Sequence, residues 1–233
     1  MDSEPKFLDL QCPYCGDTVS FPEDLQLKVQ DCPNCLEDLI IPDEPSPVAE
    51  KVPLPIETPR LVLRRFKRDD AKDALEFFSD EQLFQYAQTG PMTPEQVSEW
   101  LEKDSYKKVT SPNTWFCLAL QHRETDKVIG EVQWHLWEDR SGAVLNLYVH
   151  RKFERQGFGT EALQGTLGFC FNVLGFRRMV LLCDTRNTGA WRMAEKAHMR
   201  REGQFVKDRF LNGEWASTFQ YAMLAEEFPA GQS

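Results

Sequence analysis

The sequence lacks any apolar run close to the roughly 18 residues that a membrane-spanning helix needs. Its first ten residues, MDSEPKFLDL, also lack the basic and apolar regions of a secretory signal. We therefore expect a cytoplasmic protein, in which thiols stay reduced. Hydrophobic residues make up 41% of the 233 residues and aromatic residues 12%, so a packed core is feasible and wholesale disorder is not expected.

Basic residues are scarce in the first quarter of the chain. Residues 1–56 hold three Lys and Arg against twelve Asp and Glu, a net charge of −9. The remainder holds 24 basic and 25 acidic residues, so nearly all of the formal charge of −10 lies in the first quarter. Nucleic-acid affinity depends largely on Lys and Arg contacts to phosphates. The charge distribution therefore argues against a nucleic-acid partner for the N-terminal part.

Four cysteines of this acidic segment form two C-x2-C pairs with the overall spacing C-x2-C-x16-C-x2-C. This spacing is typical of zinc sites, because each pair brings two sulfurs to one point and four thiolates complete a closed tetrahedral shell. The segment is too short to fold on an apolar core alone, so metal binding would also supply its folding free energy. The predicted zinc ligands are Cys12, Cys15, Cys32 and Cys35.

Two alternatives to zinc are two disulfides and a thioredoxin-like redox pair. Disulfides conflict with a cytoplasmic location, and a redox pair is expected near a βαβ pattern, which this segment lacks. The segment resembles the zinc-ribbon family over residues 8–42, which implies a structural site without catalysis. We place the zinc ribbon at residues 1–42, with a hairpin between residues 17–21 and 27–31.

A change of pattern separates this ribbon from the rest of the chain. Residues 42–56 contain five prolines and few apolar anchors, so we expect a semi-rigid linker over residues 43–56. Alternating and helical apolar patterns then predict an α+β domain over 57–228, with a tail at 229–233. Expected strands are 60–66, 114–121, 128–137, 143–149, 178–184, 203–211 and 218–225. Expected helices begin at caps Asp69 or Asp70 and Thr93, and cover 159–174 and 190–197.

Two glycines, Gly157 and Gly159, lie between an expected strand and an expected helix. At a helix N-terminus the unpaired N–H groups and the helix dipole favour anions, and glycine lets the backbone approach a phosphate. The residues alone leave two interpretations open, a phosphate-binding loop and an ordinary turn. The Rossmann fingerprint is excluded, because the third glycine is missing and the preceding sheet is not βαβ.

Several longer segments match one known superfamily in the right order. They are IETPRLVLRRF at 56–66, VIGEV at 128–132, GFGTEAL at 157–163, VLGFRRMVLLCDTRNTGAWRMAEKAHMRREG at 173–203 and LNGEWASTFQYAML at 211–224. Over residues 56–226 the chain resembles the GNAT acetyltransferase superfamily, specifically its RimJ/RimL-like branch of ribosomal-protein N-terminal acetyltransferases. The resemblance implies a mixed, mostly antiparallel sheet with flanking helices and a splayed acetyl-CoA cleft.

The resemblance also implies the reaction, which is direct transfer of an acetyl group from acetyl-CoA to a primary amine in a ternary complex. Acetyl-CoA would lie between the strands that end at Val149 and Asp184, and a backbone N–H near Tyr148 or Val149 would stabilise the oxyanion. The implied cofactor-binding residues are Leu147, Tyr148 and Val149 for the pantetheine arm, Asn187 opposite them, and Arg155, Gln156, Gly157, Phe158, Gly159 and Thr160 for the pyrophosphate.

The chain departs from the family pattern at three positions. Glu154 stands where the loop usually carries Gln or Arg, and Arg155 is a candidate source of the missing charge. Ala190 and Ala194 occupy the positions of the usual Ser or Tyr proton donors. Either the thiolate leaves without a dedicated acid, which a thiol pKa of ~8.5 tolerates, or the protein is a weakened or inactive CoA-binding adaptor whose ribbon contacts proteins. We favour an enzyme, because the cofactor motifs persist.

Strand periodicity indicates a catalytic base. A period of two places Glu131 with Gln133 and His135 on one face of their strand, and Asn146 with Tyr148 on one face of the next. If these faces line the cleft, Glu131 would activate water and Tyr148 would orient it. The alternative is a solvated strand residue at Glu131. We interpret the three remaining cysteines as core residues rather than nucleophiles: Cys117, Cys170 and Cys183.

The acceptor is constrained by the resemblance alone. It favours the N-terminal α-amino group of a protein or peptide over a protein lysine or a small amine such as a polyamine or an aminoglycoside. We expect the acidic ribbon, tethered beside the cleft, to recruit a basic partner such as a ribosomal protein by electrostatic steering. Neither nucleic acid nor a membrane is an expected partner.

Overall fold

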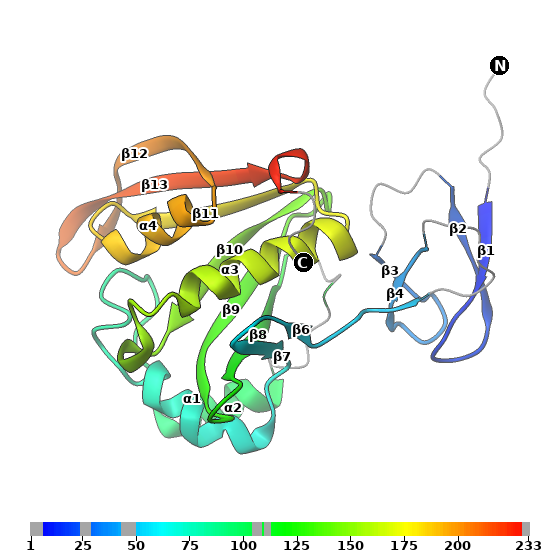
Figure 1. The fold of residues 1–233 in the computed structure, drawn as a ribbon, viewed down its shortest axis with the longest axis horizontal. Coiled ribbons are helices and arrows are strands. Elements are labelled where there is room, and N and C mark those ends of the chain that lie inside the picture. The colour runs from blue at the N-terminus through cyan, green and yellow to red at the C-terminus, as the bar shows by residue number, and fades with distance from the viewer. Residues whose placement is uncertain (1–6, 24–28, 43–49, 104–108, 110–112, 230–233) are drawn as a thin grey trace.

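The computed structural model describes residues 7–23, 29–42, 50–103, 109 and 113–229. It contains an N-terminal unit of short strands and a larger unit built on an eight-stranded sheet with flanking helices (Figure 1). Among the described helices, none combines the length and the apolar character that a membrane span requires.

Each cysteine pair of the N-terminal unit lies in the turn of its own hairpin. The N–H of Cys12 donates to the carbonyl of Asp17 (2.8 Å) and that of Gly16 to the carbonyl of Cys12 (3.0 Å), so the C-x2-C turn joins the two strands. The predicted pairing of 17–21 with 27–31 is therefore wrong, although residues 24–28 lie outside the described residues. The observed pairs are β1 (Phe7–Gln11) with β2 (Thr18–Pro22), and β3 (Val29–Asp31) with β4 (Asp38–Ile40).

The predicted linker contributes strands at its far end. β5 (Glu50–Lys51) pairs with β4 and extends the second hairpin to three strands, whereas residues 43–49 lie outside the described residues. The buried apolar side chains of this unit form a small cluster of their own: Leu10, Val19, Phe21, Leu39 and Ile41.

The large sheet has the order β12-β13-β11-β10-β9-β8-β7-β6, and β10 with β11 is its one parallel pair. A mixed, mostly antiparallel sheet is thus confirmed, and every strand expected from alternation is present. The bounds are β6 Ile56–Glu57, β7 Leu61–Arg64, β8 Trp115–His122, β9 Val128–Leu136, β10 Gly142–Val149, β11 Arg178–Asp184, β12 Arg200–Leu211 and β13 Glu214–Leu224.

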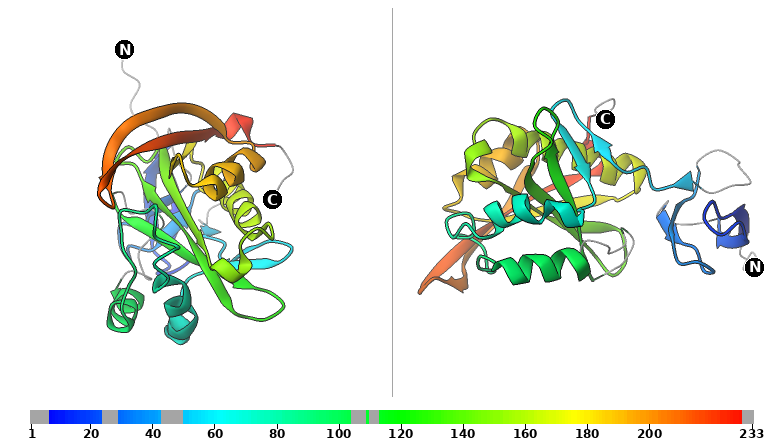
Figure 2. Two further views of the ribbon diagram at one scale, coloured as in Figure 1. Left: turned by 90° about the vertical axis from the view of Figure 1, so that its left-hand side faces the viewer. Right: turned by 90° about the horizontal axis from the view of Figure 1, so that it is seen from below.

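Helices cover both faces of this sheet (Figure 2). α1 (Ala71–Phe78) and α2 (Pro94–Lys103) pack on one face, over Cys117, Ala119 and Val128. α3 (Phe158–Gly168) and α4 (Thr188–Lys196) cover the other face, where the main core lies. Thr93 caps α2 as predicted, since its Oγ1 accepts the N–H of Gln96 at 3.3 Å. α3 continues into a π-helical turn at Phe169–Val173, and 3-10 turns occur at Arg68–Asp70, Arg151–Phe153 and Ala225–Glu227.

Asp70 stands at the N-cap position of α1, but its carboxylate does not cap that helix. It instead accepts two hydrogen bonds from the Arg64 guanidinium at 2.8 Å and one from the N–H of Lys67 at 2.7 Å. The residue is buried, so this paired carboxylate joins β7 to the start of the helix.

The ribbon is attached at the end of the sheet where β10 begins. The buried carboxylate of Asp38 accepts the N–H of Val109 at 2.9 Å, and Arg140, which precedes β10, lies 3.6 Å from Asp31. Val29 and Ile40 of the ribbon join the main core. Because the eight residues of β10 span about 25 Å, the ribbon lies far from the Val149 end (Figure 1). The expectation that it lies beside the cleft is wrong.

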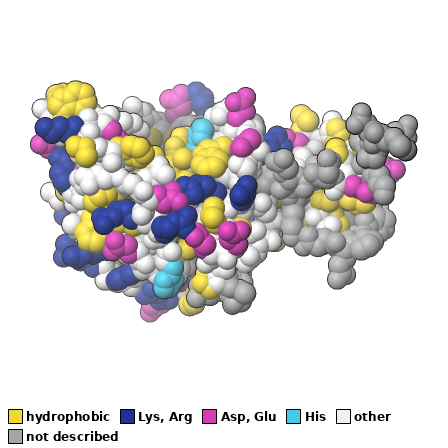
Figure 3. Space-filling model, turned by 90° about the horizontal axis from the view of Figure 1, so that it is seen from above, with side chains coloured by type: hydrophobic (Ala, Val, Ile, Leu, Met, Phe, Trp, Pro, Cys, Tyr) yellow, Lys and Arg dark blue, Asp and Glu magenta, His cyan; other side chains and the backbone are white. Residues whose placement is uncertain are grey.

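Charges are mixed over the face of the large unit that Figure 3 shows. Lys and Arg side chains are interspersed there with Asp and Glu side chains, without a large area of one sign. This agrees with the near-zero net charge that the sequence gives for residues 57–233.

Candidate active site

The two central strands of the sheet are paired at one end and separate at the other. β10 and β11 are in register from Gly142 opposite Arg178 to Leu145 opposite Leu181. Beyond these pairs β10 follows β9 as far as Val149, whereas β11 follows β13 as far as Asp184. A gap therefore opens between the last residues of the two strands, at the position that the resemblance implies for acetyl-CoA.

The hydrogen-bond pattern of β10 shows which backbone groups line this gap. The N–H of Trp137 donates to the carbonyl of Gly142, and the N–H of His150 donates to that of Ile129. Antiparallel ladders alternate, so the even-numbered residues of β10 bond to β9 and the odd-numbered residues point the other way. Leu147 and Val149 thus direct N–H and C=O groups into the gap. Tyr148 directs its backbone to β9 instead.

The loop and the start of α3 follow at the end of β10. Gly157 precedes the helix with a φ of 88°, a left-handed conformation that glycine adopts without strain. The N–H of Glu161 donates to the carbonyl of Gly157, so Phe158, Gly159 and Thr160 form the first turn, whose N–H groups have no partner within the helix. The loop side chains Glu154, Arg155 and Gln156 are exposed.

A residue far away in the sequence holds this loop. Arg60, in the turn before β7, donates from Nε to Glu161 at 2.7 Å and from a terminal nitrogen to the carbonyl of Gln156 at 3.0 Å. Thr58 also donates to Glu161, at 2.6 Å. Burial would raise the pKa of Glu161, but these hydrogen bonds outweigh it and lower the pKa. Sequence reasoning missed this cluster, since about 100 residues separate its two halves.

Asn187 lies across the gap, at the N-cap of α4. Its Oδ1 accepts the N–H of Ala190 at 3.1 Å, which fixes the amide and leaves the Nδ2 group as the donor for a ligand. Ala190 is only partly buried against the main core, and Ala194 is fully buried. Neither position carries a proton donor, so any acid must come from elsewhere.

Glu131 lies opposite Tyr148 in the β9–β10 ladder, and the two side chains share the face that α1 and α2 cover. Glu131 is 3% exposed. Its Oε1 accepts a long hydrogen bond of 3.4 Å from Gln133, and its Oε2 is buried without a partner among the described residues. Burial raises the pKa of this carboxyl to about 8. The interpretation of Glu131 as a solvated strand residue is therefore wrong.

Tyr148 remains protonated in this setting. Burial, and then the charge of Glu131, raise the pKa of its hydroxyl to about 12 against a weaker opposing hydrogen bond with Thr89. Its ring lies 5.3 Å from that of Phe84. Both contacts come from residues 79–93, the segment between α1 and α2, which therefore lies over the open end of β10.

Residues 79–93 also contact the side of the gap that follows β11. The Arg186 guanidinium lies 5.5 Å from the ring of Tyr86, and Asn212 of the β12–β13 turn donates to the carbonyl of Gln85 at 3.0 Å. Arg186 also donates two bonds of 2.8 Å to the buried carboxylate of Asp184. Arg209 adds a bond of 3.1 Å to the same carboxylate. Two guanidinium groups are thus fixed at the end of β11.

The three remaining cysteines are core residues, as predicted. Cys117, Cys170 and Cys183 are all buried. Burial raises the pKa of Cys170 well above its usual value and that of Cys183 to about 12, so neither forms a thiolate nucleophile near neutral pH.

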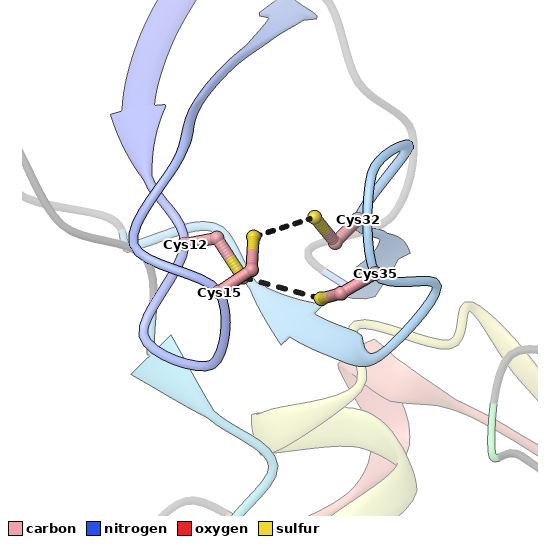
Figure 4. A group of neighbouring side chains, drawn as sticks. All are labelled: Cys12, Cys15, Cys32 and Cys35. Carbon is pink, nitrogen blue, oxygen red and sulfur yellow. Dashed lines mark hydrogen bonds between the residues drawn. The ribbon is translucent and has the colours of Figure 1, made fainter.

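The four ribbon cysteines converge on one point (Figure 4). All four Sγ atoms lie within 4.8 Å of one another, with 3.6 Å between Cys12 and Cys35 and 3.9 Å between Cys15 and Cys32. A disulfide needs an S–S distance of about 2.05 Å, so these pairs are not bonded. A zinc tetrahedron with Zn–S bonds of about 2.3 Å has edges of about 3.8 Å. The donor set and its spacing therefore fit zinc.

Comparison with known proteins agrees with this geometry. The family model described as "Acetyltransferase (GNAT) domain" matches residues 60–200. The uncharacterised N-acetyltransferase YnaD of Bacillus subtilis is 27% identical over 173 residues, which cover 74% of this chain and 98% of that protein. A GNAT-family acetyltransferase structure from Bacillus anthracis is 26% identical with a TM-score of 0.68, and the match covers 75% of this chain and all of that one.

Two structures of lower identity share the fold. RimL, a ribosomal L7/L12 α-N-protein acetyltransferase in complex with coenzyme A, has a TM-score of 0.62 at 16% identity over 73% of this chain and 98% of its own. Spermidine N-acetyltransferase from Vibrio cholerae, in complex with CoA and spermine, has a TM-score of 0.64 at 17% identity over 73% and 99%. The chain belongs to the GNAT acetyltransferase family and is an acetyl-CoA-dependent N-acetyltransferase.

Proposed function

We propose that this enzyme acetylates the α-amino group of a peptide or protein, with Glu131 as the general base. The observation that carries the proposal is the buried Glu131 carboxyl, with an unpartnered oxygen and a pKa of about 8, directly opposite Tyr148 at the open end of β10. A base with a pKa near the working pH combines a useful ionised fraction with enough basicity to remove a proton.

Different residues of the gap bind acetyl-CoA and remove the proton in the proposed reaction. Acetyl-CoA enters between β10 and β11, where Leu147 and Val149 offer backbone groups to the pantetheine amides and the loop at Gln156–Thr160 offers N–H groups to the pyrophosphate. Ionised Glu131 accepts the proton of the substrate ammonium through water, and the Tyr148 hydroxyl orients that water by donating to it. The free amine then attacks the thioester carbonyl.

The oxyanion and the leaving group need different partners. The N–H of Val149 points into the gap and is the preferred oxyanion donor, because that of Tyr148 is directed to β9. The C–S bond breaks as the amide forms. The released thiolate takes its proton from solvent or from the attacking nitrogen, which carries an extra proton after it bonds to the carbonyl carbon. A thiol pKa of ~8.5 makes this departure tolerable without an acid at Ala190 or Ala194.

The hydrogen-bond donors at the gap support a peptide acceptor over a polyamine. Arg186 and Arg209 stand at the end of β11 beside the segment that covers the site. The carboxylates of Asp184 and Glu214 balance their charge, so their contribution is hydrogen bonding rather than repulsion. A peptide brings carbonyl oxygens that guanidinium N–H groups can bond, whereas protonated spermidine brings no acceptor. We therefore expect acceptor selectivity for peptides.

Release of CoA from acetyl-CoA tests this assignment. The acceptors are a short peptide with a free N-terminus, the same peptide with a blocked N-terminus and a lysine side chain, and spermidine. We expect release with the free peptide alone. Faster release with spermidine would identify a polyamine acetyltransferase, and release with the blocked peptide would identify a lysine acetyltransferase. Tight acetyl-CoA binding without release with any acceptor would favour the CoA-binding adaptor.

We propose further that the four ribbon cysteines bind one structural Zn²⁺. The Sγ spacing matches a zinc tetrahedron, and four protein ligands leave no open position for catalysis. The thiolates must stay reduced, which fits a cytoplasmic location. Metal analysis of the purified protein should find one zinc per chain. The Cys15→Ser, Cys32→Ser double variant should lose the metal, and its retention would refute the site.

The ribbon also supports a proposal about the partner, a basic protein such as a ribosomal protein. The ribbon segment carries a charge of −9, and its distance from the gap means that only an acceptor of protein size contacts both at once. Deletion of residues 1–50 should raise KM for a basic protein acceptor and leave KM for a short peptide unchanged. An unchanged KM for the protein would exclude recruitment by the ribbon.

A further inference from the structure

The turn before β7 holds a guanidinium group against the cofactor loop. Arg60 uses its backbone N–H and its Nε for the two oxygens of Glu161, at 2.7 Å each. One terminal nitrogen donates to the carbonyl of Gln156 at 3.0 Å, and the guanidinium lies 4.3 Å from the centre of the Phe158 ring. The side chain is thus held from three sides.

These contacts determine what the loop presents to an anion. The carbonyl of Gln156 would repel a phosphate if it faced the site, and its hydrogen bond to Arg60 turns it toward a cation instead. The N–H groups at the start of α3 are then left for the ligand. Glu161 belongs to the first turn of the same helix, so the turn before β7 and the helix form one connected unit.

The second terminal nitrogen of Arg60 lies beside Gly157. A Cβ built on Gly157 would lie 3.2 Å from this nitrogen, so the nitrogen borders the backbone of the residue that begins the loop-to-helix turn. The Arg60 side chain is 45% exposed, whereas its partner Glu161 is only 13% exposed. The guanidinium is therefore partly open to solvent beside the loop, and its second terminal nitrogen has no hydrogen-bond partner among the described residues.

The alternative source of charge is Arg155, which differs in how it is held. Arg155 has a left-handed φ of 60° and its side chain is exposed. An Arg side chain that is free before binding loses rotamer entropy when it is fixed. Arg60 is already fixed by Glu161, Gln156 and Phe158, so it loses little of this entropy on binding.

We propose that Arg60 is a binding residue for the diphosphate of acetyl-CoA, which donates to a phosphate oxygen from its second terminal nitrogen and also shapes the loop through Gln156. This inference rests on the proposed binding of acetyl-CoA at the loop. It gives the loop a cation from the turn before β7, in place of the one that Glu154 does not provide.

The test compares two acetyl donors, acetyl-CoA and S-acetylpantetheine, which lacks the diphosphate and the nucleotide. The measured quantity is the ratio of kcat/KM for the two donors with a saturating peptide acceptor. Arg60→Ala should lower kcat/KM for acetyl-CoA roughly tenfold through KM, as expected for one charge-assisted hydrogen bond, and change the value for acetylpantetheine less than about twofold.

Arg123→Ala is the matched control. Arg123 donates to the carbonyl of Thr58 at 2.8 Å and pairs with Glu57, so the control disturbs the same turn without touching the loop. It should leave the ratio unchanged. Glu161→Gln removes the counter-charge of Arg60. In this variant the ratio of kcat/KM for acetyl-CoA to kcat/KM for S-acetylpantetheine should stay the same or rise. Arg60→Lys keeps a cation, so its preference for acetyl-CoA over S-acetylpantetheine should lie between those of the wild type and Arg60→Ala. If Arg60→Ala does not fold, Arg60→Lys takes its place in the test.

The outcomes separate this inference from the proposed function. An equal loss with both donors in Arg60→Ala would make Arg60 a fold-supporting residue and overturn the inference. A selective loss in Arg155→Ala but not in Arg60→Ala would assign the role to Arg155 and also overturn it. Failure of the wild-type enzyme to bind acetyl-CoA would refute both the inference and the proposed function.

Discussion

The two ends of the β10–β11 pair differ in backbone pairing and in the polar groups that they leave without a partner among the described residues. At the closed end, Gly142 to Leu145 are paired on both sides, and the ribbon is bound through Asp38 and Arg140. At the open end, Leu147 and Val149 direct backbone groups into a gap, and one oxygen of buried Glu131 has no partner in the part of the chain that the structure describes. Unsatisfied groups destabilise a fold unless a ligand meets them.

The structural role and the proposed chemical role of this sheet therefore lie at opposite ends of its central strands. The closed end satisfies its hydrogen bonds internally and carries the additional unit. The open end directs donors and an acceptor into the gap, where we propose that acetyl-CoA and an amine bind. Changes at the open end should therefore affect rate more than stability, and changes at the closed end should do the reverse.

The largest expected effect comes from Glu131→Gln at the open end. Loss of a general base lowers the rate by roughly 10²–10⁴-fold. In the wild type kcat with a saturating peptide should rise with pH and level off above about 8, because only ionised Glu131 accepts the proton of the bound ammonium and burial has raised the pKa of this carboxyl to about 8. The variant should lose this inflection. The measurement is a pH profile of CoA release with a peptide acceptor.

His135→Asn is the control for this prediction, since His135 lies on the same strand and face but opposite Val144, toward the closed end. It should keep the wild-type profile. A Glu131→Gln profile with the wild-type inflection would show that another group is the base.

A smaller loss of rate is expected from Gly130→Ala. A Cβ at this position would overlap the carbonyl oxygen of Tyr148 and lie 3.0 Å from the Cα of Val149, so β10 must shift at the residues that line the gap. A displacement of about 1 Å at an active site costs on the order of 10²-fold in rate. Steady-state kinetics and thermal unfolding together measure whether rate falls more than stability.

Gly203→Ala is the matched control, because a Cβ at Gly203 meets no atom within 4 Å. Activity and stability should both remain at wild-type values. A Gly130→Ala enzyme with unchanged kcat would mean that the gap tolerates movement of β10.

The closed end should respond to Asp38→Ala in stability rather than rate. The buried N–H of Val109 loses its acceptor, which costs about 1–3 kcal/mol. The melting temperature should fall by roughly 2–10 °C, with kcat unchanged. Arg140→Ala removes a partly exposed pair at 3.6 Å and should cost no more than about 1 kcal/mol. A loss of kcat in Asp38→Ala would show that the two ends are energetically coupled, against the account.

Local patterns in the sequence predicted most of the elements. Alternation located the strands, and a period of two placed Glu131 and Tyr148 on faces that the ladder shows to be the same one. The pairing inside the ribbon was not predicted, because alternation does not identify a strand's partner and the cysteine turns close the hairpins themselves. The gap was expected only from the resemblance, since strand divergence leaves no periodic signal.

Long-range contacts explain the rest of what was missed. The cluster of Thr58, Arg60 and Glu161 joins residues about 100 positions apart, so no local pattern reveals it. The position of the ribbon depends likewise on Asp38 meeting Val109. Charge composition predicted that the ribbon is acidic but carried no information on which end of the sheet it joins.

Removal of the zinc that we propose for the ribbon tests the separation of the two ends most directly. The metal is stripped from the ribbon with a chelator, and kcat and KM for a short peptide and acetyl-CoA are measured below the unfolding temperature. Sites this far apart act independently, so both constants should stay within about twofold of the holoenzyme while the melting temperature falls. A large loss of kcat in a sample whose sheet remains folded would contradict the account and make the ribbon part of the catalytic machinery.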